Sequence, residues 1–349
     1  MNIIWINIMK QVLVKCSTLS LIFLSVFGCK QNKVSPEIHN YLMSAVDSIQ
    51  NNALMSPNVN WEEVRSEALD DATGIETTEE TYHILKSVLR KLGDNHSFLQ
   101  KNGANISYPE SDNKRTPSPY GSRMQIEYGL HHKGGKTFAR IFIPQGMRGN
   151  TFAQNLQDKL FDLHSENPCG WIVDLRGNGG GNMWPMLAGS GPLVGDNPLG
   201  GSLSGKGEKD IYHYKNGEAI YIDYKGKKQS KAKAEEKMKL LEEQIPIAFL
   251  IDRGTASSGE ALAVIFHGRK NTRSFGEKTY GASTSTRGIK LSDSLNLVIA
   301  ISTFQDRNGK LYIDGVSPDV EIPIGDKMLT PENDPVIDQA LNWLLQNCK

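Results

Sequence analysis

The sequence has few of the features that mark several large classes of protein. It contains only 4 Cys in 349 residues and neither a CxxC nor an HExxH motif, so no zinc or other metal site is predicted. Acidic and basic residues balance at 39 each, which leaves no overall basic charge to recruit nucleic acid. Long apolar runs are also missing, which excludes a polytopic membrane protein, since each membrane-spanning helix needs ~20 apolar residues.

The composition that remains is that of a globular protein. Hydrophobic residues make up 38% of the chain, and 33 Gly add another 9% (33/349). This fraction excludes a disordered chain and a collagen-like repeat. At about 150 residues per domain, the length predicts two domains with enough chain to bury a large core.

The N-terminal segment has the pattern of an export signal. Residues 1–28 contain two lysines and no acid, and an apolar run from Leu19 to Phe27 ends just before a Gly-Cys pair at Cys29. This pattern resembles a bacterial lipoprotein signal. We therefore expect residues 1–28 to be a lipoprotein signal peptide and Cys29 to carry a lipid that anchors the protein in the bacterial cell envelope, facing the periplasm or at the cell surface. A plain secretory signal and an N-terminal anchor are the alternatives.

The other cysteines give little information about pairing. Cys16 lies within the signal segment, which leaves Cys169 and Cys348 in the rest of the chain. An oxidising envelope permits a disulfide between these two, but two cysteines so distant in sequence do not predict one.

Residues 29–100 are expected to form a small helical domain. Helix starts are indicated at Ser35, which precedes a proline, at Asn60, and at the capping box that begins with Thr77. Apolar residues follow each start at helical spacing, and Gly93 is a suitable C-terminal stop. The segment 101–123 is rich in Ser, Pro, Asn and Lys and is expected to be a linker.

Residues 124–349 alternate between apolar strands and amphipathic helices. Continuous apolar strands separated by helices favour a parallel sheet covered on both faces. Residues 190–244 are expected to be an insertion that contains a hairpin. Within it, the seven lysines of Lys225–Lys239 are interpreted as a solvated helix edge rather than a nucleic-acid patch. Expected strands cover 138–143, 170–175, 247–251 and 295–304, and expected helices cover 152–163 and 256–267.

Three segments could carry chemistry. The first contains His96, in the loop that follows the Gly93 stop. A single histidine is more often structural than catalytic, but a polar loop can hold an imidazole in place without burying it.

The second segment runs from Trp171 to Gly181 and ends in three glycines. Glycines allow a ligand to approach backbone N–H groups, which suits an oxyanion hole, although a tight turn at the end of a strand has the same composition.

The third segment places Ser257 and Ser258 between a strand and a helix. A serine at a helix N-terminus lies where developing negative charge is stabilised, but serine is also a common helix cap.

Together these segments resemble the C-terminal processing (tail-specific) and tricorn-core family of serine peptidases. The blocks LGDNHSFL, IVDLRGNGGG, DRGTASSGEALA, GEKTYGAST and GVSPDVEI occur in family order between about residues 36 and 325. The resemblance implies an α/β fold with a Clp-protease/crotonase-like spiral core, preceded here by the helical domain.

The resemblance also implies roles for individual residues. Ser257 maps to the nucleophile, and His96 maps to the histidine base of the tricorn-like branch. The N–H of Ser258 would form the oxyanion hole with that of Gly180 or Gly181. Asn95 falls where that branch has a serine that orients the histidine, and the orienting acid falls nearest Asp314, with Asp306 as an outside candidate.

Two departures separate this chain from the processing-peptidase branch. That branch uses a lysine 25 positions after the serine, where this sequence has Ala282, and Lys278 lies four residues earlier. The branch also carries a PDZ module, for which the segment between His96 and the strand at Phe138 is too short.

The predicted function is therefore an envelope serine endopeptidase that acts through an acyl-enzyme on polypeptide substrates and needs no cofactor. A catalytically inactive lipoprotein of the same fold that binds a ligand or peptide is the main alternative. A crotonase-type acyl-CoA enzyme is a weaker one, because acyl-CoA is cytoplasmic. The sequence does not indicate an oligomeric state.

Overall fold

The computed structural model describes residues 33–106, 118, 120, 123–146, 149–196, 198–235, 238–325 and 333–348. The expected signal peptide and Cys29 lie outside these residues. Among the residues described, the helices are all too short or too polar to cross a bilayer.

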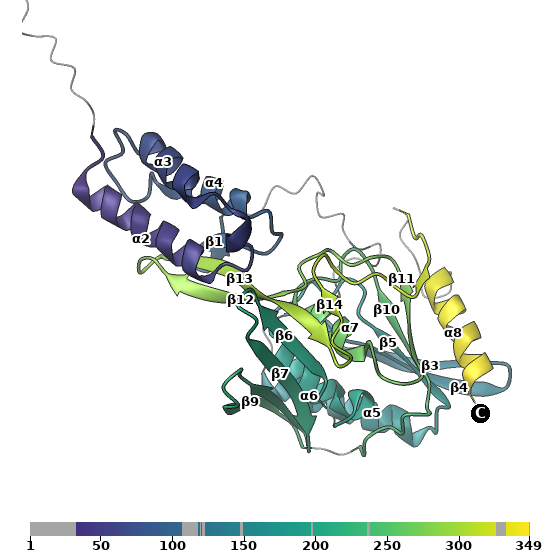
Figure 1. The fold of residues 1–349 in the computed structure, drawn as a ribbon. Helices are drawn as coiled ribbons and strands as arrows, with labels where there is room; N and C mark the ends of the chain where they lie inside the picture. The colour runs from purple at the N-terminus through teal and green to yellow at the C-terminus, as the bar shows by residue number, and fades with distance from the viewer. Residues whose placement is uncertain are drawn as a thin grey trace, which may run out of the picture.

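The N-terminal part of the chain packs three helices together, at the purple end of the ribbon in Figure 1. These are α2 (Pro36–Asn52), α3 (Trp61–Asp71) and α4 (Tyr82–Leu92), with a short 3-10 turn η1 (Ser56–Asn58). The caps are those expected: Ser35 and Asn60 accept N–H bonds at the starts of α2 and α3, and Gly93 ends α4 at φ 70°. The capping box at Thr77 forms its hydrogen bonds with Glu80, but only turns follow, so α4 begins at Tyr82 rather than at Thr77.

The core contains a six-stranded sheet whose strands are mostly parallel. In spatial order it consists of β15 (Val320–Glu321), β11 (Thr272–Gly276), β10 (Ile247–Ile251), β5 (Gly170–Asp174), β4 (Lys136–Phe142) and β3 (Glu127–Lys133). Only the β3–β4 pair is antiparallel. Every residue of β5 and β10 is buried, which explains why their sequences are continuously apolar.

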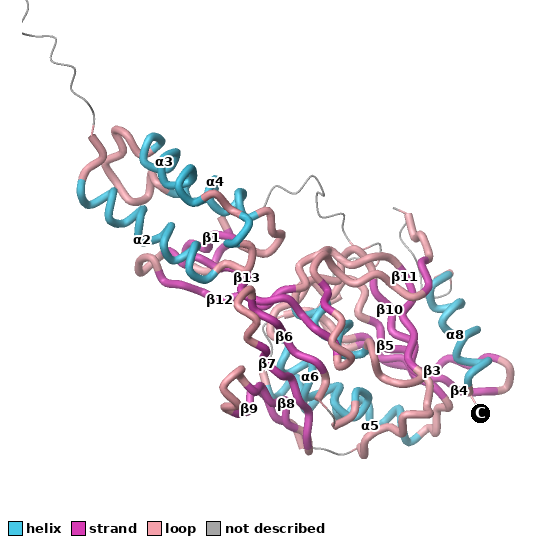
Figure 2. The backbone as a smooth tube through the Cα atoms, viewed as in Figure 1, coloured by secondary structure: helices cyan, strands magenta, loops and turns pink. Residues whose placement is uncertain are grey.

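A second, antiparallel sheet lies beside the first, and its strands appear in magenta in Figure 2. Its main path runs β2 (Ala104–Asn105), β1 (Phe98–Lys101), β13 (Leu295–Asp306), β6 (Gly200–Ser204), β7 (Lys209–Lys215), β8 (Glu218–Ile222) and β9 (Lys228–Lys233). Strands β12 (Thr284–Lys290) and β14 (Leu311–Tyr312) also pair with β13.

The lysine-rich segment corrects one expectation. Residues 228–233 form the edge strand β9, which pairs with β8, so the interpretation of Lys225–Lys239 as a helix edge is wrong. Four of its six side chains are exposed, and lysines on an edge strand hinder pairing with another chain.

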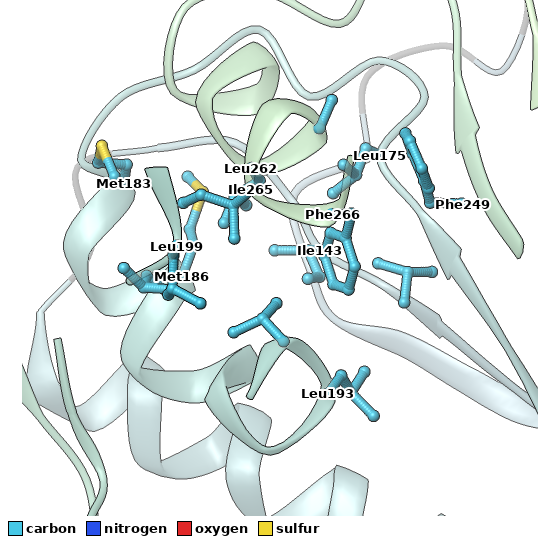
Figure 3. Packing of buried hydrophobic residues seen from close by; sticks show 14 of the residues in the cluster. Ile143, Leu175, Met183, Met186, Leu193, Leu199, Phe249, Leu262, Ile265 and Phe266 are labelled. Carbon is cyan, nitrogen blue, oxygen red and sulfur yellow. The ribbon is translucent and has the colours of Figure 1, made fainter. Parts of the chain in front are cut away.

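Helices cover both faces of the parallel sheet. One face packs with α5 (Asn150–Ser165), α6 (Met183–Val194) and α7 (Ser258–Phe266) in the main hydrophobic core, where Phe249 and Phe266 stack at 5.9 Å between centroids (Figure 3). The other face packs against α8 (Pro335–Asn347). A disulfide joins Cys169, just before β5, to Cys348, just after α8.

The long strand β13 connects the helical unit with the core. Its first half places Leu295, Leu297 and Ile299 among the N-terminal helices, whereas Phe304 near its other end lies in the main core. Figure 1 shows β12 and β13 passing from the helices into the core. The helical unit therefore shares its hydrophobic core with residues some 200 positions later in the chain.

Candidate active site

The loops after β5 and β10 are joined by hydrogen bonds. Thr255 Oγ1 donates to Leu175 O (2.9 Å), and the Ala256 N–H donates to Asn178 O (2.9 Å). These strands are parallel neighbours, so both loops emerge at the same edge of the sheet. The glycine turn and the serine segment, which are 80 residues apart in sequence, thus form one structure.

Ser257 stands at the junction between the second loop and α7. Its φ of 52° and ψ of −116° lie outside the regions that L-residues ordinarily occupy, and such strain is held in place only by surrounding contacts. One such contact is the Ser257 N–H, which donates to Glu260 Oε2 (2.8 Å). The position at the N-terminus of α7 puts the Ser257 hydroxyl in a positive backbone field.

Glu260 connects the Ser257 loop to a third segment. Its Oε1 atom accepts the Thr279 hydroxyl (2.6 Å) and the Gly281 N–H (2.9 Å), while Oε2 holds Ser257. Burial raises the pKa of the Glu260 carboxyl, and these hydrogen bonds oppose the rise. One buried side chain therefore fixes Ser257 relative to the chain that leads into β12.

The glycine turn lies directly against Ser257. A Cβ on Gly180, whose φ is +103°, would lie 2.7 Å from Ser257 Cβ and 3.1 Å from its Oγ. The Gly180 N–H already donates to Asn178 Oδ1 (3.0 Å). The next residue, Gly181, bridges to Gly146, and its carbonyl accepts the Ser258 hydroxyl (2.8 Å). Of the two expected donors in this turn, Gly180 would thus have to release an internal hydrogen bond before it could bind an oxyanion.

His96 is held at the end of α4 by its neighbours. Asp94 Oδ1 accepts the N–H groups of His96 (2.8 Å) and Ser97 (2.6 Å). The Ser97 hydroxyl donates to Asp94 Oδ2 and accepts the Ala300 N–H of β13 (3.0 Å). The histidine loop is thereby attached to the strand that crosses the molecule.

The side chain of His96 contacts a residue that lines the cleft of Ser257. His96 Nδ1 lies 2.8 Å from Thr284 Oγ1, and Thr284 is the first residue of β12. Thr284, Ser257, Ser258 and Gly181 together line a cleft of about 280 Å³. Sequence reasoning missed Thr284, although it ends the GEKTYGAST block, because a lone threonine at the start of a strand gives no catalytic signal.

The other expected site residues gather around Gly281. A Cβ on Gly281 would lie 3.1 Å from Asp314 Oδ1 and 3.4 Å from Asn95 Nδ2. Asp314 forms an ion pair with Lys278 (2.6 Å), and its side chain is 75% exposed. Ala282, at the position of the lysine in the processing branch, is buried. The orienting roles expected for Asn95 and Asp314 stay predictions.

The cleft continues toward the N-terminal helices. A second cavity of about 600 Å³ is lined by Trp61 on the helical side, by Tyr224 in the turn after β8 and by Arg287 of β12. The two cavities share Asp210 and Tyr221. A groove therefore leads from Ser257 to the helical unit.

A buried charge network supports the glycine turn from behind. Arg176 is fully buried and pairs with Asp174 (2.8 Å) and with Asp334 (2.8 Å), the N-cap of α8. Burial opposes the charged form of Asp174. The pKa of its carboxyl is nevertheless held well below the ordinary value by three guanidinium groups, those of Arg176, Arg123 and Arg140. The turn is thus tied to the C-terminal helix.

Taken together, a strained serine at a helix N-terminus, a glycine turn against it and a histidine bonded to a residue of the same cleft fit a site for nucleophilic acyl transfer. A family model described as "Peptidase family S41" matches residues 138–322, more than half of the chain. The chain belongs to this family and is a serine-type peptidase. The resemblance inferred from the sequence is thereby confirmed.

Two relatives show how far the similarity extends along the chain. The nisin-resistance protein of Lactococcus lactis subsp. lactis is 27% identical over 320 residues, which cover 89% of this chain and 93% of that protein. The carboxy-terminal processing protease CtpA of Bacillus subtilis is 25% identical over 182 residues, which cover 52% of this chain and 34% of that protein.

A solved structure shares the fold across nearly the whole chain. A lipoprotein from Streptococcus agalactiae matches with a TM-score of 0.66 at 23% identity, covering 90% of this chain and 98% of that one. The expected α/β fold with a peptidase core of this type is confirmed by such neighbours.

Proposed function

We propose that this protein is a lipid-anchored endopeptidase of the bacterial envelope in which Ser257 is the nucleophile and His96 is the general base. The observation that carries the proposal is the cleft in which Ser257 and the His96-bonded Thr284 both lie. The family assignment supports the reaction class, and the local geometry supports the choice of residues.

The proposed reaction is acyl transfer. Ser257 Oγ attacks the carbonyl carbon of a peptide bond while His96 Nε2 takes the hydroxyl proton. The tetrahedral intermediate collapses, and the imidazolium gives that proton to the leaving amine, so the C–N bond breaks and an acyl-enzyme remains. Water, deprotonated by His96, then hydrolyses the ester and regenerates the serine.

The proposed oxyanion hole consists of the N–H groups of Ser258 and Gly181. Ser258 is the first residue of α7, so its N–H lies at the positive end of the helix dipole. Gly180 was the other expected donor, and it would first have to release Asn178 Oδ1. We favour Gly181, whose carbonyl already accepts the Ser258 hydroxyl beside the start of α7.

A polypeptide is the proposed substrate, and the groove from Ser257 to the helical unit is its proposed binding site. The groove is lined by aromatic rings such as Trp184, Tyr221 and Trp61 together with polar groups. Such a mixture suits an extended chain, because rings contact side chains while polar groups bond its backbone.

The envelope location and the lipid at Cys29 are proposed from the N-terminal pattern. A basic region, an apolar run and a small residue before Cys29 have the order of a lipoprotein signal. The similarity to a streptococcal lipoprotein supports this proposal. A bond between Cys169 and Cys348 is compatible with an oxidising compartment.

The decisive experiment is labelling of the protein with a fluorescent fluorophosphonate, which reacts with activated serines. We expect the wild type to be labelled and the Ser257→Ala variant to be silent. His96→Ala should be labelled at least about 100-fold more slowly, as is typical for the loss of a general base. Thermal melting of each variant verifies that it is folded.

Either of two results would refute the proposal. Folded wild type that stays unlabelled would favour the alternative of a catalytically inactive ligand- or peptide-binding lipoprotein. Labelling that persists in Ser257→Ala would place the nucleophile elsewhere, and peptide mapping of the labelled protein would locate it.

A further inference from the structure

We infer that Thr284 is the residue that positions the imidazole of His96, in the role that a carboxylate fills in many serine hydrolases. The inference rests on the proposed function, because it assigns His96 the part of general base. It starts from one contact: His96 Nδ1 lies 2.8 Å from Thr284 Oγ1, within ordinary hydrogen-bonding range.

The proposal assigns the donor role in this contact to the ring, with the threonine oxygen as acceptor. When Nδ1–H donates to the threonine oxygen, the neutral imidazole has its lone pair on Nε2, which is the tautomer that can accept the serine proton. A threonine oxygen carries no charge, so it orients the ring without the electrostatic stabilisation that a carboxylate gives the imidazolium. Thr284 would therefore supply orientation and tautomer selection only.

The surrounding structure makes Thr284 a rigid partner. Its exposure is only 7%, and it pairs with Thr303 of β13 at the start of β12. Three residues earlier, the Gly281 N–H is held by Glu260, which also holds the Ser257 N–H. The nucleophile and the proposed positioning residue are thus connected through one buried carboxylate.

Both ends of the hydrogen bond are attached to β13. The His96 loop is joined to Ala300 through Ser97, and Thr284 is paired with Thr303. One strand, β13, therefore holds the segments of both side chains, although the two residues lie 188 positions apart in sequence. Such double attachment keeps the ring in one orientation, which general-base catalysis requires.

Asp314, the acid expected from the family pattern, has a different setting. Its carboxylate pairs with Lys278 and its side chain is largely exposed, so its charge is screened by solvent. If the buried Thr284 hydroxyl positions His96, its removal should slow the reaction more than removal of the exposed Asp314 charge does.

The test compares fluorophosphonate labelling rates of the full-length mature protein. Thr284→Val keeps the shape and removes the hydroxyl, and we expect labelling to be about 10- to 100-fold slower. Thr284→Ser restores a hydroxyl and should recover most of the rate. Thr137→Val is the matched control, because it also removes a threonine hydroxyl bonded to a histidine Nδ1, that of His132, but Thr137 does not line the cleft, and the labelling rate of this variant should stay near that of the wild type.

A second measurement does not depend on the rate. Nitrogen-15 NMR of the His96 ring reports the tautomer of the neutral form. We expect the proton on Nδ1 in the wild type and in Thr284→Ser, and a mixture of tautomers in Thr284→Val. A merely structural threonine would leave this spectrum unchanged in the folded variant.

The outcomes separate the two proposals. Wild-type labelling that depends on Ser257, together with a Thr284→Val rate near that of the wild type, would overturn the role of Thr284 and leave the proposed function intact. A larger loss in Asp314→Asn than in Thr284→Val would likewise overturn it. If Thr284→Val does not fold, a wild-type spectrum with the proton on Nε2 refutes the role by itself. Folded wild type that cannot be labelled removes the proposed function, and the positioning role with it.

Discussion

At the scale of single residues, the space beside Ser257 depends on the missing side chain of Gly180. The Gly180 backbone approaches the serine so closely that an added methyl would lie 3.1 Å from Ser257 Oγ. Its φ of +103° is also costly for any other residue. Both requirements explain why a glycine stands at this point of the turn.

We predict that Gly180→Ala slows fluorophosphonate labelling of Ser257 by about 100-fold, since a small displacement of a reacting group costs about that much. The backbone strain should also lower the free energy of unfolding by about 1–2 kcal/mol. Gly207→Ala is the control, because Gly207 has a φ of +80° and open space around it. Equal labelling of both variants would contradict the prediction.

The sequence is informative for some of these residues and silent for others. Ser257, Ser258 and the triglycine turn could be located because they follow apolar strands and carry local patterns. Thr284 could not, since its importance comes from one contact with a residue 188 positions away. The strained φ of Ser257 was equally invisible, because surrounding contacts impose it.

At the scale of elements, α8 is held in place by its N-cap. Asp334 accepts the N–H groups of Val336 (3.0 Å) and Ile337 (3.1 Å) and pairs with the buried Arg176. The same carboxylate thus begins the helix and neutralises a guanidinium behind the glycine turn.

We predict that Asp334→Ala lowers the free energy of unfolding by about 3–5 kcal/mol, because it leaves the Arg176 charge buried without one of its partners. Urea unfolding measures the difference. Asp338→Ala, in the same helix but with a 71% exposed side chain 3.9 Å from Lys133, should change it by less than about 0.5 kcal/mol. Similar losses in the two variants would show that the buried pair has no special weight.

Elements differ in how clearly the sequence marks them. β5 and β10 were predictable because burial on both faces demands unbroken apolar runs. The sequence predicts a helix edge at β9, which is wrong, because an exposed edge strand has no apolar face to set a period of two. The sequence does not indicate β12 either, because most of its side chains are partly or fully exposed and form no apolar face.

At the scale of the whole molecule, the Cys169–Cys348 disulfide closes most of the core into a loop. The two cysteines are 179 residues apart and join the start of β5 to the end of α8. We predict that replacing both by serine lowers the free energy of unfolding by about 5 kcal/mol, the loop-entropy value for that separation.

Urea unfolding with and without a reducing agent measures this effect. Reductant should destabilise the wild type about as much as the double substitution does, and it should leave the double variant unchanged. A wild type whose midpoint does not respond to reductant would show that the bond contributes nothing to stability.

The pairing of β1 with β13 has a consequence for timing. Phe98 finds its partner Val298 only 200 residues later, and the His96 loop is held by Ala300. Chains are synthesised from the N-terminus, so the His96 loop can be fixed by β13 only after the last sixth of the polypeptide has begun to be made. The parts of the candidate site that carry Ser257 and His96 can therefore come together only when synthesis of the chain is nearly complete.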